Sequence, residues 1–188
     1  MRIAISGPAG SGKTTVCMLV ADRLGYERVL VGQIFRKMAQ ERGVDLDIFG
    51  RLAEEDETID RELDQRMLAI ARANEDIVLE GRLAGIMLKA NGVPVLAVWI
   101  TAPEDVRVKR VAGREGKPEE EVLREMRRRE NSERKRYRAY YGVDIADTSP
   151  YDLCIDSNEL SAEKIAGLIA DRAKEEMARH AGEGEEGC

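Results

Sequence analysis

Short runs of apolar residues alternate along the chain with longer stretches in which apolar residues recur every three or four positions. The short runs predict five strands, and the spaced patterns predict helices between them. Strands joined by helical crossovers favour a parallel sheet that is covered by helices on both faces. The predicted strands are residues 2–6, 28–31, 76–80, 95–100 and 153–156. The chain is therefore expected to adopt an α/β fold.

The helical patterns differ in length. The first helix is predicted over Lys13–Leu24, because Gly25 is a typical signal for a helix end. Two later regions, 33–72 and 103–141, are helical without a strand and are longer than a simple crossover needs. The predicted breaks within them are Gly43 and Gly50 in the first region, and Gly113, Gly116 and Pro118 in the second. We expect both regions to fold over the ligands as insertions.

A complete phosphate-binding loop pattern, G-x-x-x-x-G-K-[ST], directly follows the first predicted strand. Its residues are Gly7, Pro8, Ala9, Gly10, Ser11, Gly12, Lys13 and Thr14, with Thr15 next. Glycines let successive N–H groups converge on one anion, and the following helix adds its positive N-terminal end. Lys13 is expected to reach the β and γ phosphates, and the Thr14 hydroxyl to bind Mg²⁺. The strand-to-helix context disfavours a ligand-free turn, so the sequence predicts binding of ATP or GTP.

Length and charge limit the alternatives. The 188 residues suffice for one α/β domain, and the longest apolar stretch, Val93–Ile100, is too short to span a membrane. Three cysteines without C-x-x-C spacing indicate neither a disulfide framework nor a zinc site. The net charge is −6, yet residues 107–138 hold 13 basic and 7 acidic residues. A local basic cluster suits a small polyanion better than nucleic acid. Because the chain enters its first strand at once and no apolar stretch could span a membrane, we expect a cytoplasmic protein without membrane contacts, and a monomer is expected as well.

Charged residues follow the second and third predicted strands. Arg36 and Arg82 come after these strands, at the sheet edge where ligands of open parallel sheets collect. Their guanidinium forks suit bidentate phosphate contacts, and their joint placement indicates a second phosphorylated ligand, although either alone could be a surface arginine. Glu80 ends the third strand, where it could hold Mg²⁺ through water or pair with Arg82.

Arginines dominate the last helical region. Arg127, Arg128 and Arg129 are consecutive, so they point all around a helix and some of them must face inward. Arg110 and Arg114 lie one turn apart, as expected for a flap that brings positive charge to a transferring phosphoryl group. A salt-bridged surface helix is the alternative. No Ser/His/Asp or Cys/His arrangement is present, but a phosphate monoester, with a second pKa near ~6, needs no base at pH 7.

Six stretches together carry a family resemblance. They are GPAGSGKTT at 7–15, GQIFR at 32–36, IDRELD at 59–64, EGRLAG at 80–85, RVAGREGK at 110–117 and RENSERKRY at 129–137. In this order they resemble the archaeal type of cytidylate kinase, a nucleoside monophosphate (NMP) kinase, over about residues 1–175. The resemblance implies a P-loop kinase core of about 1–32, 73–110 and 126–175, an NMP-binding insertion at about 33–72 and a lid at about 111–125. The polar residues 176–188 are expected to form a disordered tail.

The same resemblance implies an activity and roles for residues. ATP would phosphorylate CMP or dCMP, with Mg²⁺ required. Arg36 and Arg82 would bind the CMP phosphate, and Arg110 and Arg114 would bind ATP. The pattern R-x-x-x-[DE]-x-x-R would contact the acceptor through Arg129, Glu133 and Arg136. The catalytic residues implied are Lys13, Arg82, Arg114 and Arg129.

The base-reading positions depart from those of bacterial relatives. Val31 stands where these have a small hydroxyl residue, and Leu83 stands where they have an aspartate. Cytosine recognition must then lie elsewhere, and an acceptor for its amine could come from Asp60, Asp64 or Gln33. Adenylate and shikimate-type kinases remain alternatives. A regulatory GTPase is disfavoured because no asparagine is followed by lysine, as its N-K-x-D signature requires.

Overall fold

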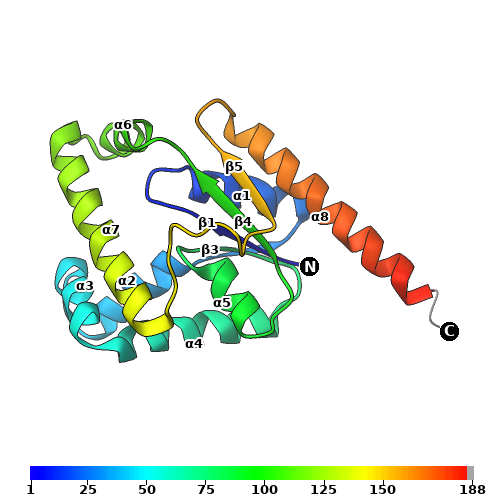
Figure 1. Ribbon diagram of the computed structural model, residues 1–188, viewed down its shortest axis with the longest axis horizontal. Coiled ribbons are helices and arrows are strands. Elements are labelled where there is room, and N and C mark those ends of the chain that lie inside the picture. The colour runs from blue at the N-terminus through cyan, green and yellow to red at the C-terminus, as the bar shows by residue number, and fades with distance from the viewer. Residues whose placement is uncertain (186–188) are drawn as a thin grey trace.

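A five-stranded, all-parallel sheet forms the centre of the computed structural model, which describes the backbone of residues 1–185 and the side chains of residues 1–179. The strands are β1 (Arg2–Ser6), β2 (Glu27–Leu30), β3 (Ile77–Glu80), β4 (Leu96–Thr101) and β5 (Leu153–Asp156). Their order in the sheet is β2-β3-β1-β4-β5 (Figure 1). The predicted α/β fold with a five-stranded parallel sheet is confirmed, and β1, which leads into the phosphate loop, lies at its centre.

Eight helices connect and cover the strands in the described residues. They are α1 (Lys13–Leu24), α2 (Val31–Glu41), α3 (Leu46–Glu55), α4 (Glu57–Ala73), α5 (Ala84–Ala90), α6 (Glu104–Glu115), α7 (Glu119–Tyr141) and α8 (Ala162–Glu185). The predicted bounds of α1 are confirmed, and Gly25 ends it with a φ of 69°. This left-handed conformation is one that glycine adopts at little cost.

Alternating side chains of the strands build two cores, one on each face of the sheet. Ile3 and Ile5 of β1 point toward α1 and α8, whereas Ala4 points toward α4 and α5. All three residues are fully buried. Because both faces are covered, the central strands β1, β3 and β4 carry buried apolar residues at successive positions, with polar residues mainly at their ends, as parallel sheets require. The sheet is thus a rigid support for the loops that follow its strands.

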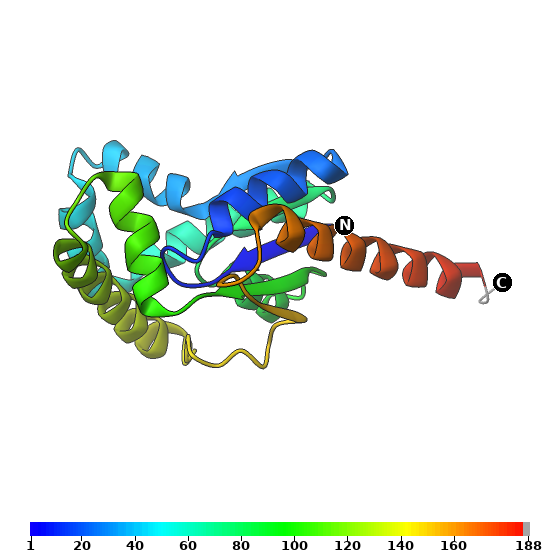
Figure 2. The ribbon, with the colours of Figure 1, turned by 90° about the horizontal axis from the view of Figure 1, so that it is seen from above.

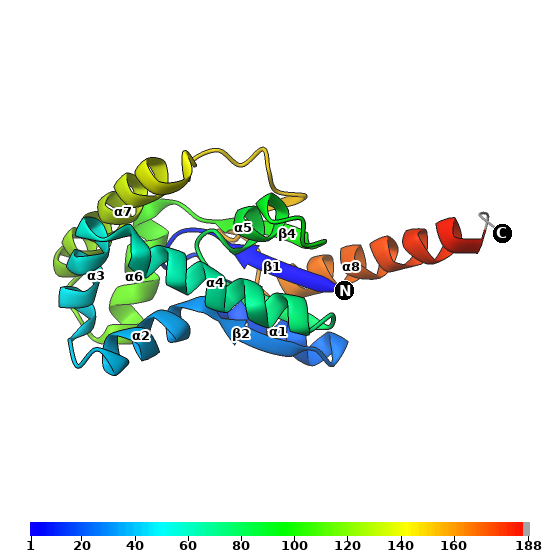
Figure 3. The same cartoon turned by 90° about the horizontal axis from the view of Figure 1, so that it is seen from below.

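The remaining four helices gather at one end of the sheet. The carboxyl ends of the strands point toward α2, α3, α6 and α7, which Figures 2 and 3 show grouped on that side of the molecule. The strands β1 and β3 end at Ser6 and Glu80. The phosphate loop at residues 7–14 and the two long helical regions therefore meet at the same edge, as ligand sites of open α/β sheets do.

The structure corrects several details of the predicted elements. Val31 begins α2 instead of ending β2, and both Gly50 and Gly113 lie inside helices rather than at breaks. A glycine within a helix costs only ~1 kcal/mol relative to alanine, which packing of the same helix can offset. Phe49 and Ala53 provide such packing in α3, where both are fully buried.

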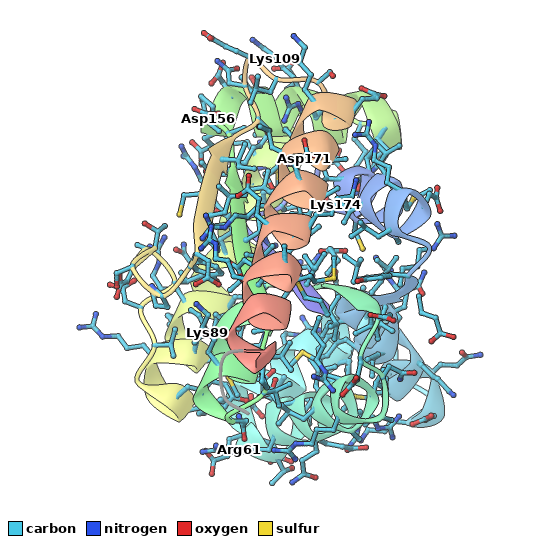
Figure 4. The ribbon with its side chains drawn as sticks, turned by 90° about the vertical axis from the view of Figure 1, so that its right-hand side faces the viewer. Arg61, Lys89, Lys109, Asp156, Asp171 and Lys174 are labelled. Atoms are coloured by element: carbon cyan, nitrogen blue, oxygen red, sulfur yellow. The ribbon has the colours of Figure 1, made fainter. Side chains whose placement is uncertain are left out.

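The C-terminal segment also differs from expectation. Disorder was expected from residue 176, but α8 continues as a helix to Glu185, and residues 186–188 lie outside the described part. Its first half packs on α1, and its second half projects beyond the sheet (Figure 1). Asp171 and Lys174 mark its course in Figure 4. Among the described residues, no helix has the length and apolar character needed to cross a membrane.

Candidate active site

The phosphate loop is packed so closely that two of its glycines admit no side chain. A Cβ atom on Gly7 would lie 2.0 Å from the carbonyl oxygen of Ile100, at the end of β4. A Cβ atom on Gly10 would lie 2.6 Å from the carbonyl oxygen of Arg107, in α6. Both glycines also have positive φ angles, of 145° and 76°. The loop is therefore held against β4 and α6 in one conformation.

Lys13 lies beneath the loop with its side chain buried. Its Nζ donates a hydrogen bond of 2.7 Å to the carbonyl oxygen of Pro8 and lies 3.9 Å from Oε1 of Glu80. Burial, and next the charge of Arg82, lower the pKa of Lys13 to about 7, while Glu80 acts in the opposite direction. A buried cation with so low a pKa is one that an incoming anion would stabilise.

Thr14 and Glu80 form a small group of oxygen atoms beside Lys13. The Thr14 hydroxyl donates to Oε2 of Glu80 at 3.1 Å. Of the two possibilities for Glu80, pairing with Arg82 is wrong, because Arg82 pairs with Glu133 instead. A hydroxyl and one carboxylate fit Mg²⁺, which takes few protein ligands and completes its shell with water and substrate phosphates. The described residues contain no cluster of three or more His, Cys, Asp or Glu that could hold a metal alone.

A cavity of about 410 Å³ opens beside the phosphate loop and the start of α1. Its lining beyond the loop comes from α6, from the segment between β5 and α8 and from the start of α8, and includes Arg110, Arg114, Ser157, Leu160 and Ile165. Arg110 is fixed there, since it donates to the hydroxyl and carbonyl oxygens of Ser157 at 2.9 and 2.6 Å. The Ser157 hydroxyl in turn donates to the carbonyl oxygen of Ser11 at 3.0 Å. The cavity thus joins polar groups at the loop to apolar walls beyond it.

Glu133 of α7 binds two of the predicted arginines. Its Oε2 lies 2.9 Å from Nε of Arg82, and its Oε1 accepts a hydrogen bond of 2.9 Å from Nε of Arg129. The side chains of Glu133 and Arg82 are only 5% and 12% exposed, whereas that of Arg129 is 58% exposed. Burial acts to raise the pKa of Glu133, but the surrounding arginines, first among them Arg82, lower it overall. The carboxylate therefore stays charged and fixes both guanidinium groups.

Two acids of α4 are also engaged with α7. Asp60 is 4% exposed and accepts from Nη1 of Arg136 through both of its oxygens, at 2.9 and 3.0 Å. Asp64 accepts a hydrogen bond from the Tyr141 hydroxyl. Burial raises the pKa of Asp64 to about 6, although the Tyr141 hydrogen bond opposes this shift. Both acids thus join α4 to α7, a use that the sequence analysis did not foresee.

Two predicted arginines stand apart from these contacts. Arg36 is exposed on α2, at a cavity of about 360 Å³ formed with Gln40 and the turn before α3. No hydrogen bond or ion pair of its side chain occurs within the described part of the chain. Arg114 is exposed as well, and within the described residues its one ion pair is with its neighbour Glu115, at 2.9 Å. Both side chains keep their donors available at the rims of the two cavities.

Two residues with clear roles in the site were missed from sequence. Ser157 follows β5, so the rule that selected Arg82 from a strand end could have found it. Arg107 was counted only as part of the basic cluster, yet it is buried and donates to the loop carbonyl of Ala9 at 3.0 Å. No pattern of residue types distinguishes it from its neighbours.

Comparisons with known proteins give a consistent result. The cytidylate kinase-like family matches residues 2–159. A cytidylate kinase from Haloarcula marismortui is 48% identical over 157 residues, covering 84% of this chain and 81% of the relative. One from Methanocaldococcus jannaschii is 41% identical over 171 residues, covering 90% and 96%.

Solved structures share the fold at lower identity. A shikimate kinase from Acinetobacter baumannii, in complex with shikimate, aligns with a TM-score of 0.60 and 20% identity, covering 93% of each chain. An uncharacterized protein from Eubacterium ventriosum aligns with a TM-score of 0.67 and 22% identity, covering 92% of this chain and 97% of its own. These two likenesses concern the fold alone.

Proposed function

Because the chain belongs to the cytidylate kinase-like family, we propose that its ATP-dependent phosphorylation of CMP takes place at the carboxyl edge of the sheet, between the phosphate loop and α7. The single observation that carries this location is the Arg82–Glu133–Arg129 group, which lies beside the loop and joins it to α7. Guanidinium groups placed there can neutralise two phosphates that must approach end to end. Both CMP and dCMP are proposed as acceptors.

The donor side is the cavity of about 410 Å³. ATP would place its phosphates in the loop, where Lys13 and backbone N–H groups bind them. Its nucleoside would lie between Arg110 and the segment that follows β5, where the half-buried Leu160 provides apolar surface. The exposed Arg114 would turn inward with the lid, residues of about 111–125. Closure of such a lid excludes water, which would otherwise accept the phosphoryl group.

The acceptor side is the space enclosed by the NMP-binding insertion, about 33–72, and α7. Arg36 lines a cavity on α2 and has no side-chain partner among the described residues, and Arg82 lies between the loop and Glu133. We assign these two arginines to the phosphate of CMP. Arg129 and Arg136 would orient the nucleotide from α7. The acceptor is already ionised at pH 7, so the chain needs to align it and supplies no general base.

Thr14 and Glu80 would hold Mg²⁺, Glu80 through water. When bound, the ion would neutralise charge on the donor phosphates. For the cytosine amine, the three candidates are no longer equivalent. Asp60 and Asp64 are bonded to Arg136 and Tyr141, whereas Gln33 is exposed and its side chain has no hydrogen-bond partner in the part of the chain that is described. Gln33 is therefore the preferred candidate. A cytoplasmic location and a monomeric state remain predictions.

A nucleotide panel tests the function. ADP release would be measured by a coupled assay with CMP, dCMP, UMP, AMP and shikimate as acceptors. We expect CMP and dCMP to give the highest kcat/KM. Turnover of AMP or shikimate above that of CMP would contradict the assignment, and Gln33→Ala with unchanged selectivity among nucleotides would remove Gln33 from the base site.

A further inference from the structure

Three consecutive carbonyl groups of the phosphate loop each accept a hydrogen bond from a cationic side chain. Arg82 donates to Gly7 at 3.2 Å, Lys13 donates to Pro8 at 2.7 Å and Arg107 donates to Ala9 at 3.0 Å. A loop that turns its N–H groups toward an anion turns its carbonyls away from it, and buried carbonyls need partners. These three cations therefore fix the direction of the loop's amides.

Only one of the three cations has no proposed contact with a substrate. Lys13 and Arg82 are assigned to nucleotide phosphates, so each must change or share its partners during the reaction. Arg107 is 8% exposed, and its donors are directed to the protein itself. Its Nε donates to the carbonyl of Ala102 at 3.2 Å, and its Nη1 donates to Ala9 and to Glu130 of α7. The hydrogen bond from Arg107 to Ala9 can therefore persist while Lys13 and Arg82 turn from the loop carbonyls to the phosphates.

Glu130 fixes the direction of the Arg107 guanidinium. Its Oε1 lies 2.6 Å from Nη1, the same nitrogen that donates to Ala9. The backbone of Arg107 also supports the loop apex, because Gly10 packs directly against it. A planar guanidinium with donors in fixed directions can join all three acceptors, whereas the ammonium of a lysine cannot reproduce that geometry.

We propose that Arg107 is a positioning residue for the donor nucleotide, which holds the Ala9 carbonyl outward so that the loop amides face the phosphates of ATP, with Glu130 orienting its guanidinium. The inference rests on the proposed placement of ATP in the loop. Arg107 itself touches neither nucleotide. Loss of the hydrogen bond from Arg107 to the Ala9 carbonyl weakens binding of ATP and leaves binding of CMP unaltered.

The chain supplies a matched control. Arg127 of α7 pairs with Glu104 of α6 through two contacts of 2.9 and 2.7 Å. This pair joins the same two helices as Arg107 and Glu130, and its partners are also 23 residues apart. It is exposed to solvent, and among the described residues neither partner forms a hydrogen bond or ion pair with the loop. Glu104→Gln therefore breaks an exposed α6–α7 ion pair while leaving the hydrogen-bond partners of Arg107, namely Ala102, Ala9 and Glu130, in place.

The experiment compares Arg107→Lys, Glu130→Gln, their combination and Glu104→Gln. Dissociation constants would be measured by calorimetry for the ATP analogue AMP-PNP with Mg²⁺, and separately for CMP alone, with urea unfolding as a check of the fold. We expect AMP-PNP to bind about tenfold more weakly to Arg107→Lys, and about threefold more weakly to Glu130→Gln, as the loss of charge-assisted hydrogen bonds implies. The CMP constant should stay within twofold of wild type in every variant.

The double variant separates a shared contact from independent effects. If Glu130 acts through Arg107, the double variant should bind AMP-PNP no more weakly than Arg107→Lys alone. Unchanged AMP-PNP binding in Arg107→Lys, or an equal loss for CMP and AMP-PNP, would overturn the proposal, as would an equal effect of Glu104→Gln. Should CMP fail as an acceptor in the nucleotide panel while Arg107→Lys still weakens AMP-PNP, the proposed function would fail and the role of Arg107 would stand.

Discussion

Arg136 of α7 donates from a single nitrogen to both carboxylate oxygens of Asp60, and this buried ion pair joins α7 to α4. Removal of one partner leaves the other charge buried and unpaired. We expect Asp60→Ala to lower the free energy of unfolding by about 3–5 kcal/mol, measured by urea denaturation. Asp47→Ala is the control, because it removes an exposed pair with Arg128 of α7 and should have little effect. Equal losses in the two variants would contradict the prediction.

Asp64 gives the fold a pH dependence. Its pKa of about 6 lies above the ordinary value, so between about pH 4 and pH 6 the folded protein holds a proton that the unfolded chain has released. The protonated Asp64 carboxyl group therefore contributes its full stability below pH 4, and this contribution is lost as the pH rises through 6. Asparagine at this position does not titrate. We therefore expect the free energy of unfolding of Asp64→Asn, relative to that of wild type, to rise by about 2 kcal/mol between pH 4 and pH 7. Urea unfolding of both proteins at pH 4 and pH 7 tests this prediction. An equal change in stability with pH in wild type and in Asp64→Asn would contradict it.

Lys13 should take up a proton when ATP binds. With a pKa of about 7 it is largely neutral at pH 8, and the phosphates of ATP stabilise its charged form. Calorimetry at pH 8 in buffers of different ionisation enthalpy should therefore report uptake of up to about one proton per ATP. Lys13→Met should abolish this uptake. An ATP binding enthalpy that is independent of the buffer would show that Lys13 is already charged.

Arg36 and Arg82 should differ in what their loss does to the protein. Arg36 is exposed without a partner in the described part of the chain, so Arg36→Ala should raise the KM for CMP about tenfold and leave stability within ~0.5 kcal/mol. Arg82→Ala should raise the KM for CMP and depress kcat by about 10²-fold or more, because Arg82 is proposed to contact the reacting phosphate.

Arg82→Ala should also destabilise the fold, since it leaves Glu133 with the exposed Arg129 as its nearest partner. Steady-state kinetics with CMP as the varied substrate, together with urea unfolding, separate the two variants. A change in the KM for ATP alone would place Arg82 on the donor side. Unchanged kinetics in Arg36→Ala would remove that residue from the acceptor site.

Sequence reasoning succeeded where structure is determined locally. The phosphate loop, the bounds of α1 and its end at Gly25 follow from residue types within a few positions of one another. It was less successful for Gly50 and Gly113, because packing of the surrounding helix outweighed the weak preference of glycine to break it.

Contacts between distant segments were beyond the reach of sequence patterns. The pairing of Asp60 with Arg136 joins residues 76 positions apart, and the sequence assigned each of them to the nucleotide without indicating that they pair with each other. Their burial against each other depends on how α4 and α7 pack, which periodicity does not specify. The position of Arg107 was equally beyond sequence patterns, because the carbonyl of Ala9 to which it donates is 98 positions away in the chain. The predicted assignment of residues to ATP, CMP and Mg²⁺ is a matter for the measurements above.

The position of Glu133 has a consequence for turnover. A carboxylate shared by Arg82 and Arg129 competes with any phosphate for the same guanidinium donors. If Arg82 and Arg129 bind the acceptor as proposed, this competition weakens the binding of CDP as well as of CMP. A catalyst gains nothing from binding its ground states tightly, since a product that dissociates slowly limits the rate of the next cycle. On the proposed assignment, Glu133 would therefore favour rapid release of the product over high affinity for the substrate.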